Sequence, residues 1–369
     1  MSFLAGNDVR MAVDPGFPWG RNSPSVRQRV VVSLLIGLIA ALMQYARADA
    51  AGGYSDFSTV WFGARMMLDG LNPYESIGPG RLVEMPSPPY YPAPAFIAAI
   101  PFTLFPFQSA STVFVFLSTY LLAWGSTADG WHRLPMFPSI VFVVSAQFAQ
   151  WSILFTAAAF LPVLAMFAAA KPQASLPVIV GSSGWPTFIW AIAGGAVLIG
   201  CSFILAPMWP RDWWALIQTT DHFTPPILQF GGPAIALVLL RWRRPEAWLV
   251  FAAACSPQTW YPYNGLILLV VAATYREASI LSLASSAGWI VAFLAGDGKP
   301  RSPYTREIMA AMLIAACYLP ATIVVLRHPN VGPTPFWLRW FDRRSNLIAR
   351  DSQVGEAADT PDKSWADRP

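Results

Sequence analysis

The chain alternates long uncharged apolar runs with short polar segments. A helix needs about 20 apolar residues to cross a hydrocarbon layer about 30 Å thick, so the longer runs must each hold a pair of helices. Dividing the runs at proline, glycine and polar residues predicts an all-α polytopic membrane protein with about twelve transmembrane or re-entrant helices. The stretches without Asp, Glu, Lys or Arg are Val30–Ala46, Ala93–Ala128, Leu134–Ala170, Pro172–Pro210, Phe223–Leu240, Ala247–Tyr275, Ala278–Gly296 and Ile308–Leu326.

Composition agrees with a membrane protein. Hydrophobic residues make up 55% of the chain and charged residues 12%, against about 25% charged residues in soluble domains. Two of the predicted helices, Ala174–Ser183 and Ala247–Ser256, are short for a membrane crossing. Non-helical backbone at membrane depth requires a protein or water environment, so short helices favour a protein with an internal cavity.

The distribution of Lys and Arg predicts the orientation. If the number of crossings is even, three basic groups share the cytoplasmic face by the positive-inside rule. The external face then carries the loop that contains Asp56, Asp129–Arg133, Lys171, Trp209–Asp221 and Asp297–Arg306, and Gln150 lies near the cytoplasmic face. This asymmetry accounts for the net charge of +4 without a nucleic-acid partner. The three groups are Arg21, Arg27 and Arg29; Arg241, Arg243 and Arg244; and Arg327, Arg339, Arg343, Arg344 and Arg350.

The same patterns divide the chain into regions. Aromatic and aliphatic residues alternate with arginines after the last apolar run, which suits a helix in the headgroup layer. The final residues are polar and are expected to be disordered. The predicted regions are a cytoplasmic leader (1–29), a multi-span catalytic domain (30–326) with a first external loop (47–90), an interfacial amphipathic segment (327–350) and a tail (351–369).

The first external loop contains an amphipathic helix. Its apolar stripe can lie on the membrane and consists of Phe57, Val60, Trp61, Ala64, Met67, Leu68 and Leu71. Asp56 stands at the N-terminal end of this helix, Gly70 near its C-terminal end and Pro73 just beyond. Asp56 is either the N-cap of the helix or a desolvated carboxylate that is basic enough to accept a proton. The sequence leaves both interpretations open.

The segment from Asp56 to Tyr74 resembles the first-loop signature of the polyprenol-phosphate-mannose-dependent α-1,2-mannosyltransferases, which are membrane glycosyltransferases with the GT-C fold. The chain differs from this family at Ala149, where glycine is common, and at Asn264, where an acidic residue is common. The resemblance covers the chain from Asp56 to about Leu268. Its later parts are Tyr90-Tyr91-Pro92-Ala93-Pro94, Gln150-Trp151-Ser152, Lys171-Pro172-Gln173, Ser256-Pro257 and Tyr263-Asn264.

The resemblance implies transfer of a hexose, mannose in that family, from a polyprenol-phosphate sugar to a lipid-linked or cell-envelope glycan with inversion of configuration. Asp56 would be the general base for the acceptor hydroxyl. We expect the protein in a bacterial plasma membrane, with cytoplasmic termini and an external active site. No cofactor is implied, although a divalent cation between Asp56 and the lipid phosphate remains open.

The departing lipid phosphate requires positive charge or hydrogen-bond donors. Lys171 is the first candidate and is equally well explained as a lysine that marks the end of a span. Arg211 and His222 are further candidates, but Arg211 can pair with Asp212 and His222 has no second ligand nearby in sequence, which favours structural roles for both. The remaining substrate-cavity candidates are Arg65, Tyr90, Tyr91, Gln173, Trp213, Trp214 and Asn264, of which the aromatic ones also suit an interfacial belt.

Other chemistries have less support. His132, His222 and His328 are far apart in sequence and lack partners at metal-ligand spacing, so no metal site is predicted. A transporter or flippase of lipid-linked sugars is the alternative function, but such a protein is expected to carry ionisable residues within its spans, and these spans are nearly free of charge. A non-catalytic membrane scaffold with the same fold is the third possibility.

Overall fold

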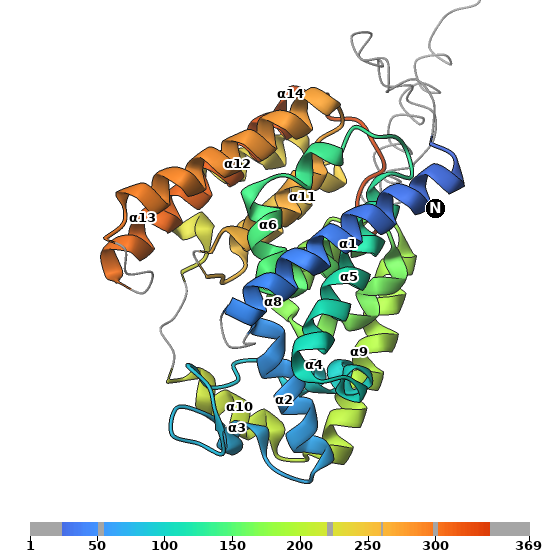
Figure 1. The fold of residues 1–369 in the computed structure, drawn as a ribbon. Coiled ribbons are helices and arrows are strands. Elements are labelled where there is room, and N and C mark those ends of the chain that lie inside the picture. The colour runs from blue at the N-terminus through green and yellow to red at the C-terminus, as the bar shows by residue number, and fades with distance from the viewer. Residues whose placement is uncertain (1–23, 51–54, 220–223, 260, 298–301, 340–369) are drawn as a thin grey trace, which may run out of the picture.

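The computed structural model describes residues 24–50, 55–219, 224–259, 261–297 and 302–339, and these residues form a helical bundle (Figure 1). The only strands among them are a two-residue parallel pair, β1 (Ile77–Gly78) and β2 (Val83–Glu84). The α-helices are α1 (Val26–Ala50), α2 (Asp56–Leu68), α3 (Pro73–Ser76), α4 (Ala93–Ala99), α5 (Phe107–Ser126), α6 (Ile140–Gln147), α7 (Trp151–Ala158), α8 (Pro172–Val180), α9 (Trp185–Leu205), α10 (Trp209–Ile217), α11 (Pro245–Cys255), α12 (Tyr275–Ala295), α13 (Pro303–Leu313) and α14 (Leu319–Arg327). The tighter or wider helices are η1 (Ile100–Leu104), η2 (Leu134–Met136), η3 (Pro162–Ala170), η4 (Pro226–Leu228), η5 (Gly232–Arg241), η6 (Pro262–Val271), η7 (Ile314–Tyr318) and η8 (Phe336–Leu338).

The structure confirms that the described chain is mostly helical and contains helices able to span a membrane, but it does not confirm the predicted count of about twelve. Five helical stretches within the described residues are long and apolar enough to cross a membrane. Shorter apolar helices of 10 to 17 residues accompany them. The five long stretches are Val26–Ala48, Phe107–Ser126, Trp185–Leu205, Tyr275–Ala295 and Tyr304–Arg327.

Helices α1 and α5 run antiparallel along one another and define the two ends of the bundle. Near the end of α1, Thr112 donates a hydrogen bond to Gln44 at 2.6 Å. Near its beginning, Arg29 donates to the carbonyl of Trp124 at 2.5 Å and stacks over that indole ring. Because Asp56 follows the end of α1, it lies at the end of the bundle opposite to Arg29.

This arrangement corrects the predicted position of Asp129–Arg133. The segment directly follows α5, so it lies at the Arg29 end and not on the Asp56 face. The uncharged run Ala93–Ala128 was expected to cross twice, but its prolines break the first part into the short helices α4 and η1. Trp61 of α2 donates to the carbonyls of Phe102 and Phe105, so these short helices stay at the Asp56 end and α5 is the helix that runs to the Arg29 end.

The predicted position of Gln150 near the cytoplasmic face is wrong for the same reason. Helix α6 returns from the Arg29 end, and its last residue, Gln147, accepts a hydrogen bond from Arg47 at the end of α1. Gln150 follows three residues later and contacts Asp56. The extra crossing that was expected within Ala93–Ala128 reversed the predicted side of the turn that contains Gln150.

Charged residues from distant segments meet at the Arg29 end. Arg241 donates to the carbonyls of Leu326 and His328 at 2.7 and 2.5 Å, and His328 contacts the carboxylate of Glu277 at 3.0 Å. The charge of Glu277 also acts on His132. Arg241 of the second basic group therefore lies beside the start of the third basic group, as expected for groups that share one face.

Most of the apolar stripe of α2 faces the protein, whereas Leu68 and Leu71 at its C-terminal end are exposed. Phe57, Val60, Ala64 and Met67 are buried against the rest of the bundle, and a Cβ at Gly63 would lie 2.5 Å from the ring of Phe96 in α4. The helix has the predicted start and end, but its apolar residues serve the packing of α2 on α4 and α5. Helices α2, α3 and α10 form the lower end of the molecule in Figure 1.

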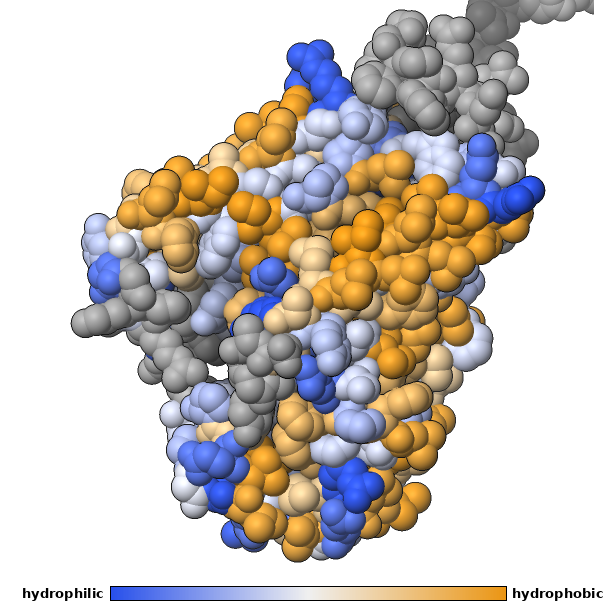
Figure 2. Space-filling model, in the orientation of Figure 1, coloured by the Kyte–Doolittle hydropathy of each residue, from blue (hydrophilic) through white to orange (hydrophobic). Residues whose placement is uncertain are grey.

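The exposed side chains of the long helices are largely apolar. Leu35, Leu38, Ile39 and Leu42 of α1 are each about half exposed or more, and similar residues line α9 and α12. Figure 2 shows apolar side chains along the flank formed by α1 and α12, with many hydrophilic residues nearer to the two ends. This distribution suits a bundle whose flank contacts lipid.

The chain after α14 packs onto the bundle. The backbone N–H of Phe336 donates to Ser182 and the indole of Trp337 donates to Val180, both in the α8–α9 region. The part of the predicted interfacial segment from residue 340 onward, the predicted tail and most of the predicted leader lie outside the described residues.

Candidate active site

Ser55, and not Asp56, caps the N-terminus of α2. The Ser55 hydroxyl accepts the backbone N–H of Ser58, and the Ser58 hydroxyl accepts the backbone N–H of Ser55, so the two residues form a reciprocal capping box. Asp56 is the first residue inside the helix. The interpretation of Asp56 as the cap is therefore wrong, and its carboxylate is free to bind a group outside its own helix.

The Asp56 carboxylate is held by a residue 94 positions later in the chain. The side-chain amide of Gln150 donates a hydrogen bond to Oδ2 of Asp56, and the Gln150 carbonyl accepts a hydrogen bond from Nζ of Lys171 at 3.2 Å. Gln150 is fully buried, whereas Asp56 and Lys171 are partly exposed. The three residues form a chain of contacts in which one amide connects an anion to a cation.

A break between two short helices points Gln150 toward Asp56. Helix α6 ends at Gln147 and α7 begins at Trp151, and between them Ala149 adopts a left-handed conformation with φ of 51°. The backbone N–H of Asp56 donates to the carbonyl of Phe148 at 3.1 Å, which fixes this turn against the start of α2. The backbone thus joins the same two segments that the side chains join.

Buried aromatic rings pack next to the junction between the start of α2 and the α6–α7 turn. Phe57 stacks on Phe114 with ring centroids 4.2 Å apart, and Trp151 lies 5.1 Å from Phe114 and 6.2 Å from Phe57. Phe57 directly follows Asp56 and Trp151 directly follows Gln150. The aromatic cluster therefore fixes the backbone that carries both polar residues.

Lys171 lies where η3 ends and α8 begins, between two tyrosines. Its ammonium group is 5.5 Å from the ring centre of Tyr91 and 5.6 Å from that of Tyr263, which permits cation–π attraction to both. The backbone of Tyr91 is held by the hydroxyl of Tyr74, which donates to its carbonyl at 3.1 Å. Thr259 holds the hydroxyl of Tyr263 at 3.2 Å.

Electrostatics make Asp56 more basic than an ordinary carboxylate. Burial raises the pKa of Asp56, and the charge of Lys171, the hydrogen bond from Gln150 and the charge of Arg47 offset only part of that rise. Burial lowers the pKa of Lys171, and the charge of Asp56 opposes this effect. A carboxylate with a raised pKa can accept a proton, and the cation beside it can attract an anion in the same small volume.

The other predicted phosphate contacts lie elsewhere or are not described. Arg211 is exposed on α10, and its neighbour Asp212 accepts a hydrogen bond from Asn72 at 2.9 Å. His222 lies outside the described residues. Of the three predicted phosphate contacts, the structure brings Lys171 to Asp56.

Among the predicted substrate-cavity residues, only Tyr91 contacts the Asp56–Gln150–Lys171 chain directly. Arg65 is exposed one turn from Asp69 and lies 4.0 Å from its carboxylate. The amide of Asn264 donates to the carbonyl and hydroxyl of Thr259 at 2.7 and 2.8 Å, so it shapes the loop beside Tyr263. Gln173 is exposed two residues after Lys171.

The Trp-rich helix α10 packs on the first loop at the Asp56 end of the molecule. The indole of Trp213 donates to the carbonyl of Tyr90 at 3.0 Å, and Asn72 joins α10 through Asp212. Trp214 is 62% exposed and Tyr90 is 44% exposed. Trp213 and Asn72 therefore fasten α10 to the first loop, while Trp214 and the ring of Tyr90 remain open to the surroundings.

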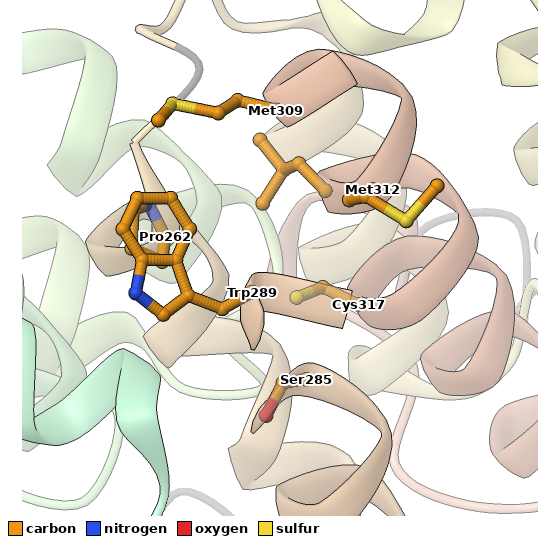
Figure 3. A pocket seen from close by; sticks show the side chains of 7 residues that line it. Pro262, Ser285, Trp289, Met309, Met312 and Cys317 are labelled. Atoms are coloured by element: carbon orange, nitrogen blue, oxygen red, sulfur yellow. The ribbon is translucent and has the colours of Figure 1, made fainter. Parts of the chain in front are cut away.

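A separate apolar cavity lies between α12, α13 and η7. It is a small hollow that is open on one side, and Trp289 and Met309 lie on its wall (Figure 3). Pro262 places one side of the cavity next to Tyr263 in the chain, but Asp56, Gln150 and Lys171 do not line it. The lining residues are Pro262, Ser285, Trp289, Met309, Met312, Leu313 and Cys317.

Sequence reasoning missed the contact roles of Gln150 and Tyr263. Both belong to segments that resemble the transferase family, and a correct crossing count would have placed Gln150 at the same end of the bundle as Asp56. Within the described part of the chain, no group of three or more His, Cys, Asp or Glu residues is placed to hold a metal ion.

Comparisons with family models, with curated proteins and with solved structures give no match for this chain.

Proposed function

We propose that the protein is a membrane glycosyltransferase that moves a hexose, mannose in the first instance, from a polyprenol-phosphate sugar to a glycan or glycolipid acceptor. The observation that carries this proposal is the proximity of Asp56 and Lys171. One is a carboxylate with a raised pKa and the other is a cation, and both are partly exposed at one end of an apolar helical bundle. The sequence resemblance supplies the class of donor.

Asp56 acts as the general base in this mechanism. The acceptor hydroxyl attacks the anomeric carbon of the donor, its proton passes to Asp56, and the bond between that carbon and the phosphate oxygen breaks. The lipid phosphate leaves with the electron pair of that bond, and the sugar is transferred with inversion. Positioned general-base catalysis contributes about 10²- to 10⁴-fold to such a rate.

Lys171 binds the leaving phosphate. Negative charge grows on the phosphate oxygens as the glycosidic bond breaks, and a nearby ammonium group stabilises that charge most strongly where water is scarce. The charge of Asp56 raises the pKa of Lys171 against the effect of burial and so favours its charged form. The pair of opposite charges therefore serves the base and the phosphate site together.

The proposal includes a location for the site. The long apolar helices, and shorter ones such as η6 and α11, together form the crossing and re-entrant segments. The Asp56 end faces the outside of a bacterial plasma membrane, and the Arg29 end with both termini faces the cytoplasm. The lipid tail of the donor stays in the bilayer while its sugar reaches Asp56.

The test incubates the purified, detergent-solubilised protein with a panel of polyprenol-phosphate sugars and an acceptor extract, and measures released polyprenol phosphate. We expect release with one hexose donor, and a strong decrease in the variant Lys171→Met. Vesicle-reconstituted protein that moves lipid-linked sugar across the bilayer without releasing lipid phosphate would instead support a flippase. No release with any donor and no transport would contradict both functions.

A further inference from the structure

The central position of Gln150 suggests a role beyond packing. Its side chain is fully buried, yet both ends of its amide are used: the N–H donates to Asp56 and the carbonyl accepts from Lys171. An amide side chain carries a donor and an acceptor on one planar group, so the order anion, amide, cation fixes which way the group faces.

Among the described residues, only one oxygen of the Asp56 carboxylate accepts a side-chain hydrogen bond. Gln150 occupies Oδ2, and among the described residues none donates a hydrogen bond to Oδ1. Asp56 is partly exposed, and Oδ1 is the oxygen left to accept a hydrogen bond from an acceptor hydroxyl. A carboxylate fixed through one oxygen presents the other in a defined direction, which a freely rotating side chain would not.

The ammonium group of Lys171 is also held by Gln150 through one of its atoms only. One of its three N–H donors goes to Gln150, and the faces of Tyr91 and Tyr263 flank the ammonium group. No direct ion pair joins Lys171 to Asp56 in the described structure. The Gln150 amide therefore bridges the two charges instead of a direct contact between them.

The backbone turn that positions Gln150 is locally strained. Ala149 is the only non-glycine residue in the described chain with positive φ, and it directly precedes Gln150. Such a conformation costs about 1–2 kcal/mol for a residue with a Cβ. The side chain of Gln150, which follows this turn, contacts Asp56.

We propose that Gln150 is the positioning residue of this site: it holds Asp56 by Oδ2 and Lys171 by one N–H, so that Oδ1 faces the acceptor hydroxyl and the ammonium group faces the leaving phosphate. This inference rests on the proposed transferase function. It adds a residue that touches neither reacting group and sets the geometry of both.

The experiment compares Gln150→Met, which has similar length but no hydrogen-bonding amide, with Gln150→Glu. A matched control is Gln147→Met, three residues earlier, whose side chain has no contact to Asp56 or Lys171. The pH dependence of kcat/KM and the separate values of kcat and KM are measured with polyprenol-phosphate mannose, or with the donor from the panel that gives the fastest release of lipid phosphate.

For Gln150→Met we expect kcat to fall about 10- to 100-fold with little change in KM, because a hydrogen bond to a charged group is lost in the transition state. The Gln150 N–H stabilises the ionised form of Asp56, so its removal also moves the acid limb of the profile to higher pH. Gln150→Glu places a second carboxylate beside Asp56 and moves that limb further. The control keeps both the wild-type rate and the wild-type profile.

A packing role would give a different result. If Gln150→Met keeps the wild-type kcat and acid limb, or loses activity without any shift of the limb, the inference is overturned. The protonation of Asp56 is also followed directly by infrared difference spectroscopy, using Asp56→Asn to identify its carboxyl band. This reading needs no activity, so it separates failure of the positioning role from failure of the transferase proposal: an Asp56 titration that is the same in wild type and Gln150→Met contradicts the former alone.

Discussion

The coupling between Asp56 and Lys171 can be measured as a stability. In wild-type protein each charge offsets the burial of the other. Removing one partner leaves the remaining charge desolvated without compensation, whereas removing both leaves an uncharged polar site. The perturbation is therefore a double-mutant cycle of Asp56→Asn and Lys171→Met.

The structure sets the size of the expected effect. Two unit charges 4 Å apart interact by about 4 kcal/mol at an effective dielectric constant of about 20, and the energy falls as the distance grows. Because Gln150 separates Asp56 from Lys171, we expect a coupling energy of about 2 kcal/mol. The double variant should be more stable than Lys171→Met alone by a comparable amount.

Equilibrium unfolding in mixed micelles at pH 7, followed by tryptophan fluorescence, supplies the four free energies of unfolding. The control cycle replaces Asp56→Asn by Asp69→Asn, because Asp69 is exposed at the far end of α2 and contacts Arg65. That cycle should be additive within about 0.5 kcal/mol. If the Asp56–Lys171 cycle is equally additive, the two charges do not act on one another and the description of the site is wrong.

Further predictions concern pH, backbone and packing. In Lys171→Met the pKa of Asp56 rises further, so the folded state binds more protons than the unfolded state above about pH 4, and unfolding titrations should show stability falling as pH rises through that window. Burial, followed by the charge of Arg133, lowers the pKa of His132 to about 4, so stability should be lost as pH falls from 6.5 toward 4, and His132→Gln should reduce that loss. A Cβ at Gly194 would lie 2.3 Å from the carbonyl oxygen of Met166, whereas Gly200 in the same helix has open space; Gly194→Ala should therefore lower the thermal midpoint and Gly200→Ala should preserve or raise it. Ala149→Gly should stay within about 1 kcal/mol of wild type in the free energy of unfolding, because relief of the left-handed strain offsets the lost methyl group, whereas Ala149→Val should destabilise by more than about 2 kcal/mol.

The sequence predicted the features that depend on local pattern. The helix that begins at Asp56 and ends before Gly70 is present, because the apolar spacing and the terminal residues act over a few neighbours. The membrane class follows from uncharged runs in the same way. Local pattern did not separate Ser55 from Asp56 as the cap, since both residue types accept the same backbone hydrogen bond.

Features that depend on the path of the chain were harder to predict. The prolines between Pro92 and Pro106 divide one apolar run into short helices and a single crossing, and this one difference moved Asp129 and Gln150 to the wrong ends. The apolar stripe of α2 was assigned to the membrane because periodicity shows which face is apolar but not what covers it. The contact between Gln150 and Asp56 joins residues 94 positions apart and has no local signal.

The most direct measurement of the central claim compares Asp56→Asn with Asp69→Asn in the assay of released polyprenol phosphate. Asparagine keeps the shape of the side chain and can still accept the hydrogen bond from Gln150, but it cannot take the proton of the acceptor. We expect transfer by Asp56→Asn to fall at least about 100-fold while Asp69→Asn transfers at the wild-type rate. Transfer by Asp56→Asn at the wild-type rate would contradict the account.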